Sequence, residues 1–265
     1  MVIETPDCLL CEGCGEANGD ADAKEPILSS EEYCSPELEQ YPELTVSVCL
    51  SDGQRRYMKI KQGMDAILSL IGLAVLAVPM GLIALTQKIL CPTEPVFFLQ
   101  NRVGQDGRLF RIVKFRTMRS DAPQEMATSQ FENPGEYITP LGSFLRRLSI
   151  DELPQLFNVL AGDMALIGPR PLIPSEQPIQ TLRERGGVYS VRPGITGLAQ
   201  INGRDRLNDY EKARFDREYV RDLSLKQDLL IFLRSFSYIL KQKDLGKGDD
   251  SSEPFSKDPD GCPPI

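Results

Sequence analysis

Two neighbouring carboxylates, Asp151 and Glu152, stand where a helix is predicted to begin, in the stretch RRLSIDELPQLFNVLAGD. An ionised, oriented carboxylate can attack phosphorus or bind Mg²⁺. Two crowded carboxylates repel each other unless a cation or nearby arginines stabilise them. The pair therefore predicts a basic surrounding and chemistry on a phosphate group.

A purely structural interpretation of the same stretch is also open. Ser149 and Glu152 have the S-x-x-E spacing of a capping box, in which Ser149 would be the N-cap. Pro154 opposes this register because proline fits best in the first helical turn. A second register places Asp151 at the N-cap. In either register Asp151 lies at the positive end of a helix, which favours its ionised form and attracts phosphates.

Basic residues occur in the short segments KFRTMR, LRR, GPRP, RPGITG and NGRD, of which the last three also contain proline or glycine. A stiff backbone can hold a guanidinium group where it binds a diphosphate with two hydrogen bonds. Each segment alone is typical of a surface turn, but their accumulation around one acidic pair favours an anion site. The candidate phosphate-binding residues are Lys114, Arg116, Arg146, Arg170, Arg192 and Arg204.

Composition excludes several classes of protein. The chain has no histidine, so Ser-His and Cys-His nucleophiles and His-bound metals are excluded. No Walker motif, GxGxxG fingerprint or nucleic-acid module is present, so no nucleic-acid partner is expected. Phosphoryl transfer, which depends on positioning and charge neutralisation, remains open to a chain without histidine.

The charge divides the chain into regions. Residues 1–54 hold 13 acidic residues and one basic residue, whereas residues 96–245 hold 22 basic and 18 acidic residues. The acidic region 1–54 lacks a sustained apolar period, which predicts a disordered tail, with a short strand at 44–50 as an option. Its CxxCxxC run (Cys8, Cys11, Cys14) is either part of a metal site or a set of free thiols. The whole chain has seven cysteines, and this odd number favours a reducing compartment. A catalytic domain is expected at 93–245 and a flexible tail at 246–265.

A membrane element is predicted within residues 55–92. Residues 66–87 are uncharged and mostly apolar, and as a helix they would reach about 33 Å, enough to cross a bilayer. Pro79 lies near the middle, and basic residues flank both ends. Positive flanks favour the cytoplasmic side, so a proline-broken, re-entrant helix is preferred over a kinked single-pass helix or a buried core helix.

The remaining chain predicts a mixed α/β, helix-rich small domain with short strands. Strands are expected at 96–100 and 110–115, joined by a turn at 104–107. Helical periodicity covers 141–148, 152–160, 174–185, 208–220 and 226–241. The last helix interleaves apolar and basic residues, so it either lies on the membrane surface as an amphipathic interfacial helix or packs on the core.

The string KFRTM…SIDELPQLFNVLAGDMALIGPRPL…RPGITGLAQINGRD…DYEKARFDREYV resembles the bacterial sugar transferase family, the monotopic phosphoglycosyl transferases. The likeness runs from about residue 59 to residue 243. It implies transfer of a hexose 1-phosphate from a UDP-sugar to polyprenyl (undecaprenyl) phosphate at the cytoplasmic face of the bacterial cell membrane, with release of UMP and assistance from Mg²⁺. It also implies a proline-broken helix that enters one leaflet without crossing.

The resemblance further implies roles for single residues. Asp151 would be the covalent nucleophile, and Glu152 would orient it, help it to hold Mg²⁺ or assist proton transfer. Asp163 and Asp216 fall on acids of the family motifs, where they either support the site or pair structurally with arginines.

Three features depart from the family pattern. Val78-Pro79 stands where Ser-Pro is common, Ala165 replaces a frequent serine, and the acidic region 1–54 has no counterpart in the minimal family pattern. A catalytically silent, membrane-anchored scaffold of the same fold is the alternative function, which the intact dyad opposes. The sugar, the glycan pathway, homo-oligomerisation and the role of the tail are left open.

Overall fold

The computed structural model describes residues 41–122, 134–203 and 206–245, all of which belong to one compact unit, Glu37–Ile265. The predictions for the CxxCxxC run, for Arg204 and for residues 246–265 lie outside the described residues. The longer helices are α1 (Asp52–Leu90), α2 (Pro140–Arg147), α3 (Gln155–Ala161), α4 (Gln177–Arg185), α5 (Leu198–Asn202), α6 (Asp209–Arg221) and α7 (Leu225–Leu245). The strands are β1 (Phe97–Val103), β2 (Leu109–Phe115), β3 (Ala165–Ile167) and β4 (Gly194–Thr196). Single 3₁₀ turns are η3 (Pro42–Thr45), η4 (Gln105–Gly107), η6 (Pro134–Glu136), η7 (Ile150–Glu152) and η8 (Val188–Ser190).

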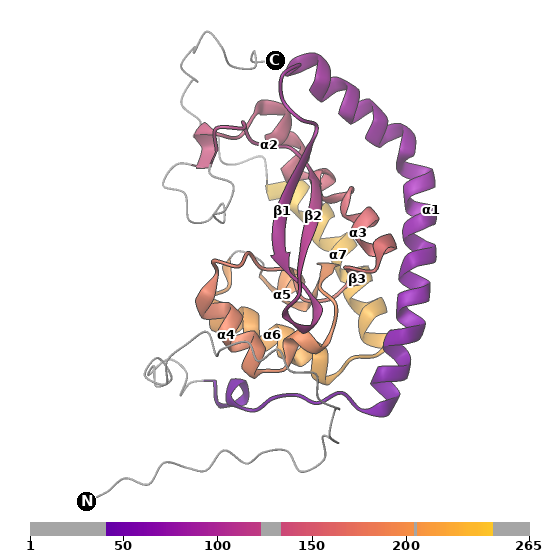
Figure 1. Cartoon of the computed structure of the whole chain (residues 1–265), viewed down its shortest axis with the longest axis vertical. Helices are drawn as coiled ribbons and strands as arrows, with labels where there is room; N and C mark the ends of the chain where they lie inside the picture. The colour runs from indigo at the N-terminus through magenta and orange to yellow at the C-terminus, as the bar shows by residue number, and fades with distance from the viewer. Residues whose placement is uncertain (1–40, 123–133, 204–205, 246–265) are drawn as a thin grey trace, which may run out of the picture. The chain divides into compact units, whose positions relative to one another are not determined.

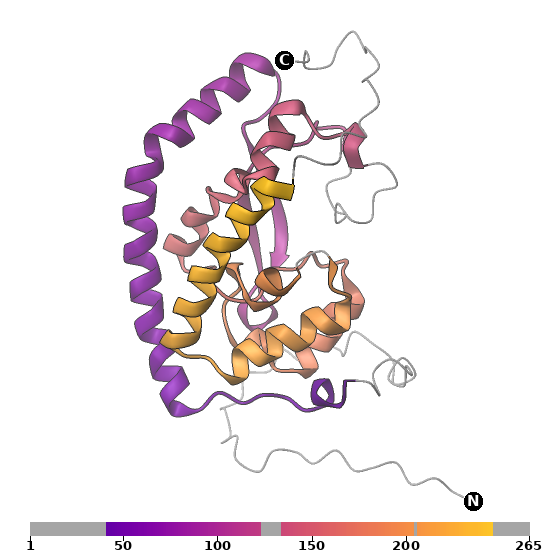
Figure 2. The ribbon, with the colours of Figure 1, turned by 180° about the vertical axis from the view of Figure 1, so that it is seen from behind.

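Helix α1 is the long apolar element, and it runs along one flank of the domain in both views (Figures 1 and 2). Its first turn is closed by a capping box between Ser51 and Gln54. Within the described chain it is the one helix long and apolar enough to cross a membrane. Pro79 lies inside it, and helical structure continues through that residue. The structure therefore shows no interruption of α1 at Pro79, where the sequence predicts a break.

One face of α1 packs against the domain. Lys61, Ser69 and Met80 are buried, and Leu156 of α3 lies only 3.3 Å from where a Cβ on Gly72 would stand, so a glycine permits this close approach. The opposite face carries an exposed apolar stripe at steps of three and four residues. Its members are Ile60, Met64, Ile67, Ile71, Val75, Val78, Leu82, Leu85 and Ile89. A soluble protein seldom exposes so long an apolar patch.

A single buried carboxylate joins α1 to two distant helices. Asp228 of α7 is 5% exposed. It accepts hydrogen bonds from Tyr57 Oη (2.6 Å) and Tyr219 Oη (2.8 Å), and it forms an ion pair with Lys61 Nζ (2.7 Å). Because a buried charge is costly unless it is paired and hydrogen-bonded, this arrangement fixes the N-terminal half of α1 against α6 and α7.

The antiparallel hairpin of β1 and β2 confirms the predicted pair of strands. Its register places Phe97 opposite Phe115 and Val103 opposite Leu109. The turn contains Asp106 with a positive φ of 55°, a conformation that aspartate tolerates better than most residues. Strand β1 begins one residue later and ends three residues later than predicted, and β2 begins one residue earlier, so the apolar alternation alone gave the ends of the strands only approximately.

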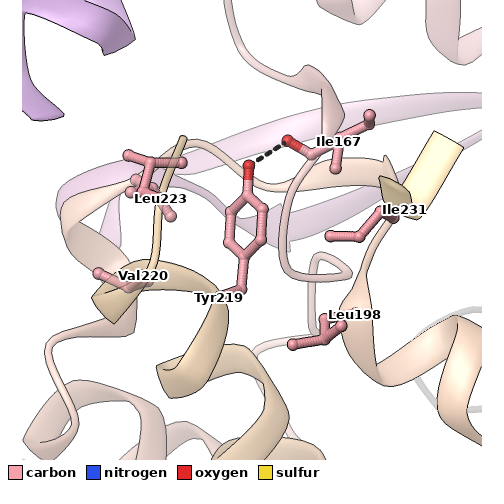
Figure 3. Packing of buried hydrophobic residues seen from close by; sticks show 7 residues of the cluster. Ile167, Leu198, Tyr219, Val220, Leu223 and Ile231 are labelled. Carbon is pink, nitrogen blue, oxygen red and sulfur yellow. Dashed lines mark hydrogen bonds between the residues drawn. The ribbon is translucent and has the colours of Figure 1, made fainter. Parts of the chain in front are cut away.

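Strands β3 and β4 form a parallel pair that the sequence did not predict. The largest buried cluster lies beside this pair, and Tyr219 stands in its centre (Figure 3). The hydroxyl of Tyr219 donates a hydrogen bond of 3.0 Å to the carbonyl oxygen of Ile167, the last residue of β3. Packing on α6 and α7 therefore positions the chain that leaves β3.

Most predicted helices are present with shifted ends. Helices α2, α6 and α7 agree with their predicted ranges within a few residues. The predicted helix at 152–160 is a 3₁₀ turn, η7, followed by the shorter α3, and α4 begins at Gln177 rather than at residue 174. The fold is thus helix-rich with few short strands, as expected.

Residues 41–50, which we call the N-terminal strap, differ from the predicted tail and from the optional strand. They form the turn η3 and then an extended segment. Leu44 is fully buried among Leu172, Leu182 and Ala213, and the Val48 N–H donates to the carbonyl oxygen of Gly186. The strap is therefore part of the domain.

Candidate active site

A left-handed residue sets the position of the acidic pair. Ser149 follows the end of α2 with φ 55° and ψ 23°, a conformation that costs a non-glycine residue about 1 kcal/mol or more. The chain then turns through η7, so that Asp151 and Glu152 point into the domain and are 9% and 7% exposed. Neither predicted helix start is found, because Ser149 makes no side-chain cap and Pro154 is the N-cap of α3.

Glu152 is held by two cations from different elements. Its Oε1 atom lies 3.1 Å from Lys114 Nζ on β2 and 3.0 Å from Arg170 Nη1, which follows β3. Charge-assisted hydrogen bonds of this kind are stronger than neutral ones. Glu152 is therefore a fixed part of the site, and it cannot serve as the helix cap that the S-x-x-E spacing suggested.

Asp151 lies beside this cluster, where opposing effects act on its pKa. Burial raises the pKa of Asp151, and the neighbouring Glu152 raises it further, whereas Lys114, Arg146 and Arg170 lower it. The net direction is upward from 3.8. Bringing a further cation close to Asp151 would favour the ionised form that a nucleophile requires.

The site also shifts the pKa of Lys114. Burial lowers the pKa of Lys114 to about 8, Glu152 opposes this shift, and Arg170 and Arg102 add to it. Asn158 of α3 fixes the register between β2 and the acidic pair, because its amide accepts from the Val113 N–H and donates to the Arg111 carbonyl. Lys114 therefore reaches Glu152 from a rigid strand.

Arg146, on the last turn of α2, completes the cationic surrounding. Its Nε atom donates 2.7 Å to Thr117 Oγ1, which is buried. The pKa of Arg146 is lowered by burial, while Asp151 and Glu152 oppose the shift. The structure thus gathers Lys114, Arg146 and Arg170 around the two carboxylates.

Two other predicted phosphate-binding residues lie elsewhere. Arg116 donates to the Pro95 carbonyl, approaches Glu94 at 3.9 Å and stacks over Phe98, so it braces the start of β1. The pKa of Arg192 is lowered by burial and raised by Asp65 and Tyr219. These neighbours place Arg192 near α1 and α6 rather than beside the acidic pair.

The two predicted supporting acids also separate from the dyad. Asp216 is 1% exposed and pairs with Arg183 of α4, which is the structural alternative. Asp163 follows the end of α3, and within the described chain no hydrogen bond or ion pair links it to Asp151 or Glu152.

Arg102 and Arg183 were missed by the sequence analysis. Arg183 lies four residues after Ile179, and both are buried on one face of α4. Asp216 likewise shares the buried face of α6 with Ala213. Opposite charges on two apolar helix faces indicate a buried ion pair. Proline or glycine beside an arginine does not reveal such a pair.

The residues present fit a magnesium ion. Mg²⁺ is commonly bound by one or two carboxylates together with substrate phosphates, and it keeps several waters. Asp151 and Glu152 supply two adjacent carboxylates, and Glu152 Oε1 is already engaged by Lys114 and Arg170. Among the residues that the structure describes, no group of three or more acids and cysteines forms a protein-only metal cage. A shared site between the dyad and a substrate diphosphate matches this donor set.

Comparison with known proteins points to one family. The chain matches the description "Bacterial sugar transferase" over residues 56–242. It is 39% identical over 185 residues to the UDP-glucose:undecaprenyl-phosphate glucose-1-phosphate transferase of Escherichia coli (strain K12), covering 67% of this chain and 39% of that protein. It is 40% identical over 195 residues to the UDP-N-acetylgalactosamine-undecaprenyl-phosphate N-acetylgalactosaminephosphotransferase of Aeromonas hydrophila, covering 69% of this chain and 44% of that protein.

A shorter relative is covered more completely. The exopolysaccharide production protein ExoY of Sinorhizobium fredii is 32% identical over 189 residues, which are 66% of this chain and 83% of that protein. By contrast, the chain spans less than half the length of the two transferases above. The family match covers most of the described residues and includes the site described above. The chain therefore belongs to the bacterial sugar transferase family.

Proposed function

We propose that the protein transfers a hexose 1-phosphate from a UDP-sugar to a polyprenyl phosphate such as undecaprenyl phosphate. The observation that carries this proposal is the buried Asp151–Glu152 pair surrounded by Lys114, Arg146 and Arg170. Such a site can neutralise a diphosphate and hold a carboxylate next to it. The names of the two undecaprenyl-phosphate transferase relatives support the same pair of substrates.

Asp151 is the nucleophile in the proposed reaction. Its carboxylate oxygen forms a bond to the phosphorus that bears the sugar, while the bond from that phosphorus to the bridging oxygen breaks and UMP leaves with this oxygen. A phosphate oxygen of the polyprenyl phosphate then attacks the same phosphorus. The bond to Asp151 breaks, its carboxylate is restored, and the product is a polyprenyl diphosphate sugar.

The other residues position charge for these two steps. Lys114 and Arg170 hold Glu152 in place, and with Arg146 they face the developing negative charge on the diphosphate oxygens. Mg²⁺, held by Asp151 and Glu152 together with the diphosphate, would supply further charge neutralisation. Glu152, held by its two cations, lies next to Asp151 in the chain and orients it.

The membrane part of the proposal concerns α1. Besides the exposed stripe on α1, helices α3 and α7 carry exposed apolar residues, including Phe157 of α3 and Leu229 and Phe232 of α7. These faces suit a re-entrant insertion into the cytoplasmic leaflet of the bacterial membrane, with α7 at the interface. The lipid-bound acceptor would then meet the site without leaving its leaflet.

The chemistry is tested with the purified full-length protein in lipid nanodiscs, with polyprenyl phosphate, Mg²⁺ and a panel of UDP-hexoses. Asp151→Asn should lower UMP release by on the order of 10³-fold or more, as removal of a nucleophile does. Asp222→Asn, on an exposed ion pair with Arg221, is the matched control and should keep wild-type activity. Mass spectrometry should find the sugar-phosphate adduct on Asp151 when the acceptor lipid is left out.

Two results would contradict the proposal. Turnover that survives Asp151→Asn would exclude the covalent step on this residue. An inactive wild-type protein with every UDP-hexose of the panel would instead favour the non-catalytic scaffold.

A further inference from the structure

The chain from Pro169 to Ile173, which we call the 169–173 segment, carries Arg170 between two prolines. Every carbonyl group of this segment accepts a hydrogen bond from a donor outside it. The donors are Gly194 N–H to Pro169 (2.8 Å), Arg183 Nη1 to Arg170 (2.7 Å), Arg102 Nη1 to Pro171 (3.1 Å), Val103 N–H to Leu172 (2.9 Å) and Gln180 Nε2 to Ile173 (2.6 Å). Four residues of the segment, all except Arg170, are buried, so their carbonyl groups need partners within the protein. Two of the five donors are arginine side chains from other elements, Arg102 and Arg183.

Arg183 binds the backbone of the residue that reaches the acidic pair. Its guanidinium is 3% exposed, and it divides its two terminal nitrogens between the carboxylate of Asp216 and the carbonyl oxygen of Arg170. The rigid fork of an arginine suits two acceptors at a fixed angle, which lysine cannot match. The position of the Arg170 backbone is therefore set by a buried ion pair between α4 and α6.

Arg102 performs the same task for the next residue. At the end of β1, its Nη1 donates to the Pro171 carbonyl and its Nη2 donates to Gln100 Oε1 at 2.6 Å. The side chain is mostly buried, with 14% of its surface exposed. The hairpin that supplies Lys114 to Glu152 thus also fixes the segment that supplies Arg170 to the same carboxylate.

On the basis of the function proposed above, we propose that Arg102 and Arg183 are positioning residues for Arg170. By holding two successive carbonyl groups of the 169–173 segment, they place the Arg170 guanidinium on Glu152 and on the diphosphate of the nucleotide sugar. Neither arginine touches the reacting phosphorus. Their effect on the reaction passes through Arg170.

The first test compares Arg102→Gln with Arg111→Gln in the full-length protein. Arg111 lies on the same hairpin and is exposed, so it is the matched control and should leave activity unchanged. Arg102→Gln should lower kcat/KM about 10- to 100-fold, as a misplaced catalytic group does. The fall should lie mainly in kcat, because the charge that Arg170 neutralises grows toward the transition state.

A double-mutant cycle separates positioning from an independent contribution. In an Arg170→Ala background, Arg102→Gln should cause less than a threefold further loss, because residues that act through one group are not additive. Arg183→Lys, which keeps the positive charge beside Asp216, should likewise cause less than a threefold further loss of activity in the Arg170→Ala background. Full additivity in both cycles would overturn the proposal.

Hydrogen exchange distinguishes this proposal from the proposed function. The amides of Gly168, Arg170, Leu172 and Ile173 should exchange at least about tenfold faster in Arg102→Gln than in Arg111→Gln, because opening the segment becomes easier. Unchanged exchange would overturn the positioning role whether or not the wild type is active. Faster exchange combined with wild-type kcat would overturn it as well, whereas a wild type without UMP release would refute the proposed function alone.

Discussion

The charge of Lys114 controls how the two carboxylates are held. Its ammonium group is the partner of Glu152 on the β2 side, and burial lowers its pKa to about 8. Below that pH the lysine is protonated and pairs with Glu152. Above it the lysine becomes neutral, so Glu152 and Asp151 lose one of the cations that stabilise them.

We expect UMP release to fall as the pH rises through about 8, with Lys114 as the cause. Lys114→Arg keeps a positive charge at high pH, so the alkaline limb should move up by at least about one pH unit, even if the maximal rate falls. Lys212→Arg, in a half-buried pair with Asp209, is the control and should keep the wild-type profile. An alkaline limb that stays in place in Lys114→Arg would assign it to another group.

Three basic residues that the sequence points to lie beside the acidic pair, but a neighbouring proline or glycine does not single them out, because it flanks Arg170 and Arg192 and neither Lys114 nor Arg146. The sequence analysis named Lys114, Arg146 and Arg170, and all three surround the dyad. It also named Arg192, which the structure places near Asp65. Local stiffness shows that an arginine is held, but the group to which it is held depends on contacts between residues far apart in sequence. Arg204 stays a prediction.

Among the elements, the N-terminal strap precedes the residues that match the family, which begin at residue 56. Its Leu44 fills a fully buried position between α4 and α6. These helices carry Arg183 and Asp216, respectively. The strap therefore stabilises the helix pair that supports the 169–173 segment.

Leu44→Ala should lower the free energy of unfolding by about 2–5 kcal/mol, because it leaves a cavity in the core. Val46→Ala, two residues away and 59% exposed, should change it by less than about 0.5 kcal/mol. Denaturant unfolding in matched detergent, followed by far-UV circular dichroism, measures both. Equal effects of the two substitutions would show that the strap leaves the domain in solution.

Element prediction succeeded where apolar periodicity extends over several turns. Helices α6 and α7 and the β1–β2 hairpin have such patterns, and they lie close to the predicted ranges. Strands β3 and β4 have three residues each, too few to show a period. The strap has no period either, because Leu44 is buried by two helices that lie more than 120 residues further along the chain.

For the whole molecule, the relation of α1 to the domain decides the membrane topology. Buried Lys61, near the start of α1, and buried Met80, near its end, both pack on the same domain. If α1 crossed a bilayer about 30 Å thick, one of these two contacts would lie away from the aqueous side on which the domain stands. The insertion that keeps both ends of α1 on one side stays a prediction, and these two contacts are the reason to test it.

Cysteine labelling in intact bacterial cells tests this topology. Variants that keep only Cys8 or only Cys262 should both resist a membrane-impermeant maleimide, and both should react after the cells are permeabilised. The two residues flank the described chain, so a single-pass α1 would place them on opposite sides. Labelling of Cys8 alone in intact cells would establish a spanning helix.

The carboxylate of Asp228 that binds Lys61 and Tyr57 lies near the C-terminal end of the described chain, whereas its partners lie near the beginning. During synthesis, the ribosome has made nearly the whole domain before Lys61 can meet this counter-ion. Until then the counter-ion of Lys61 within α1 is Asp65, four residues further along the helix. The contacts that fix the N-terminal half of α1 against α6 and α7 can therefore form only after nearly the whole domain has been translated.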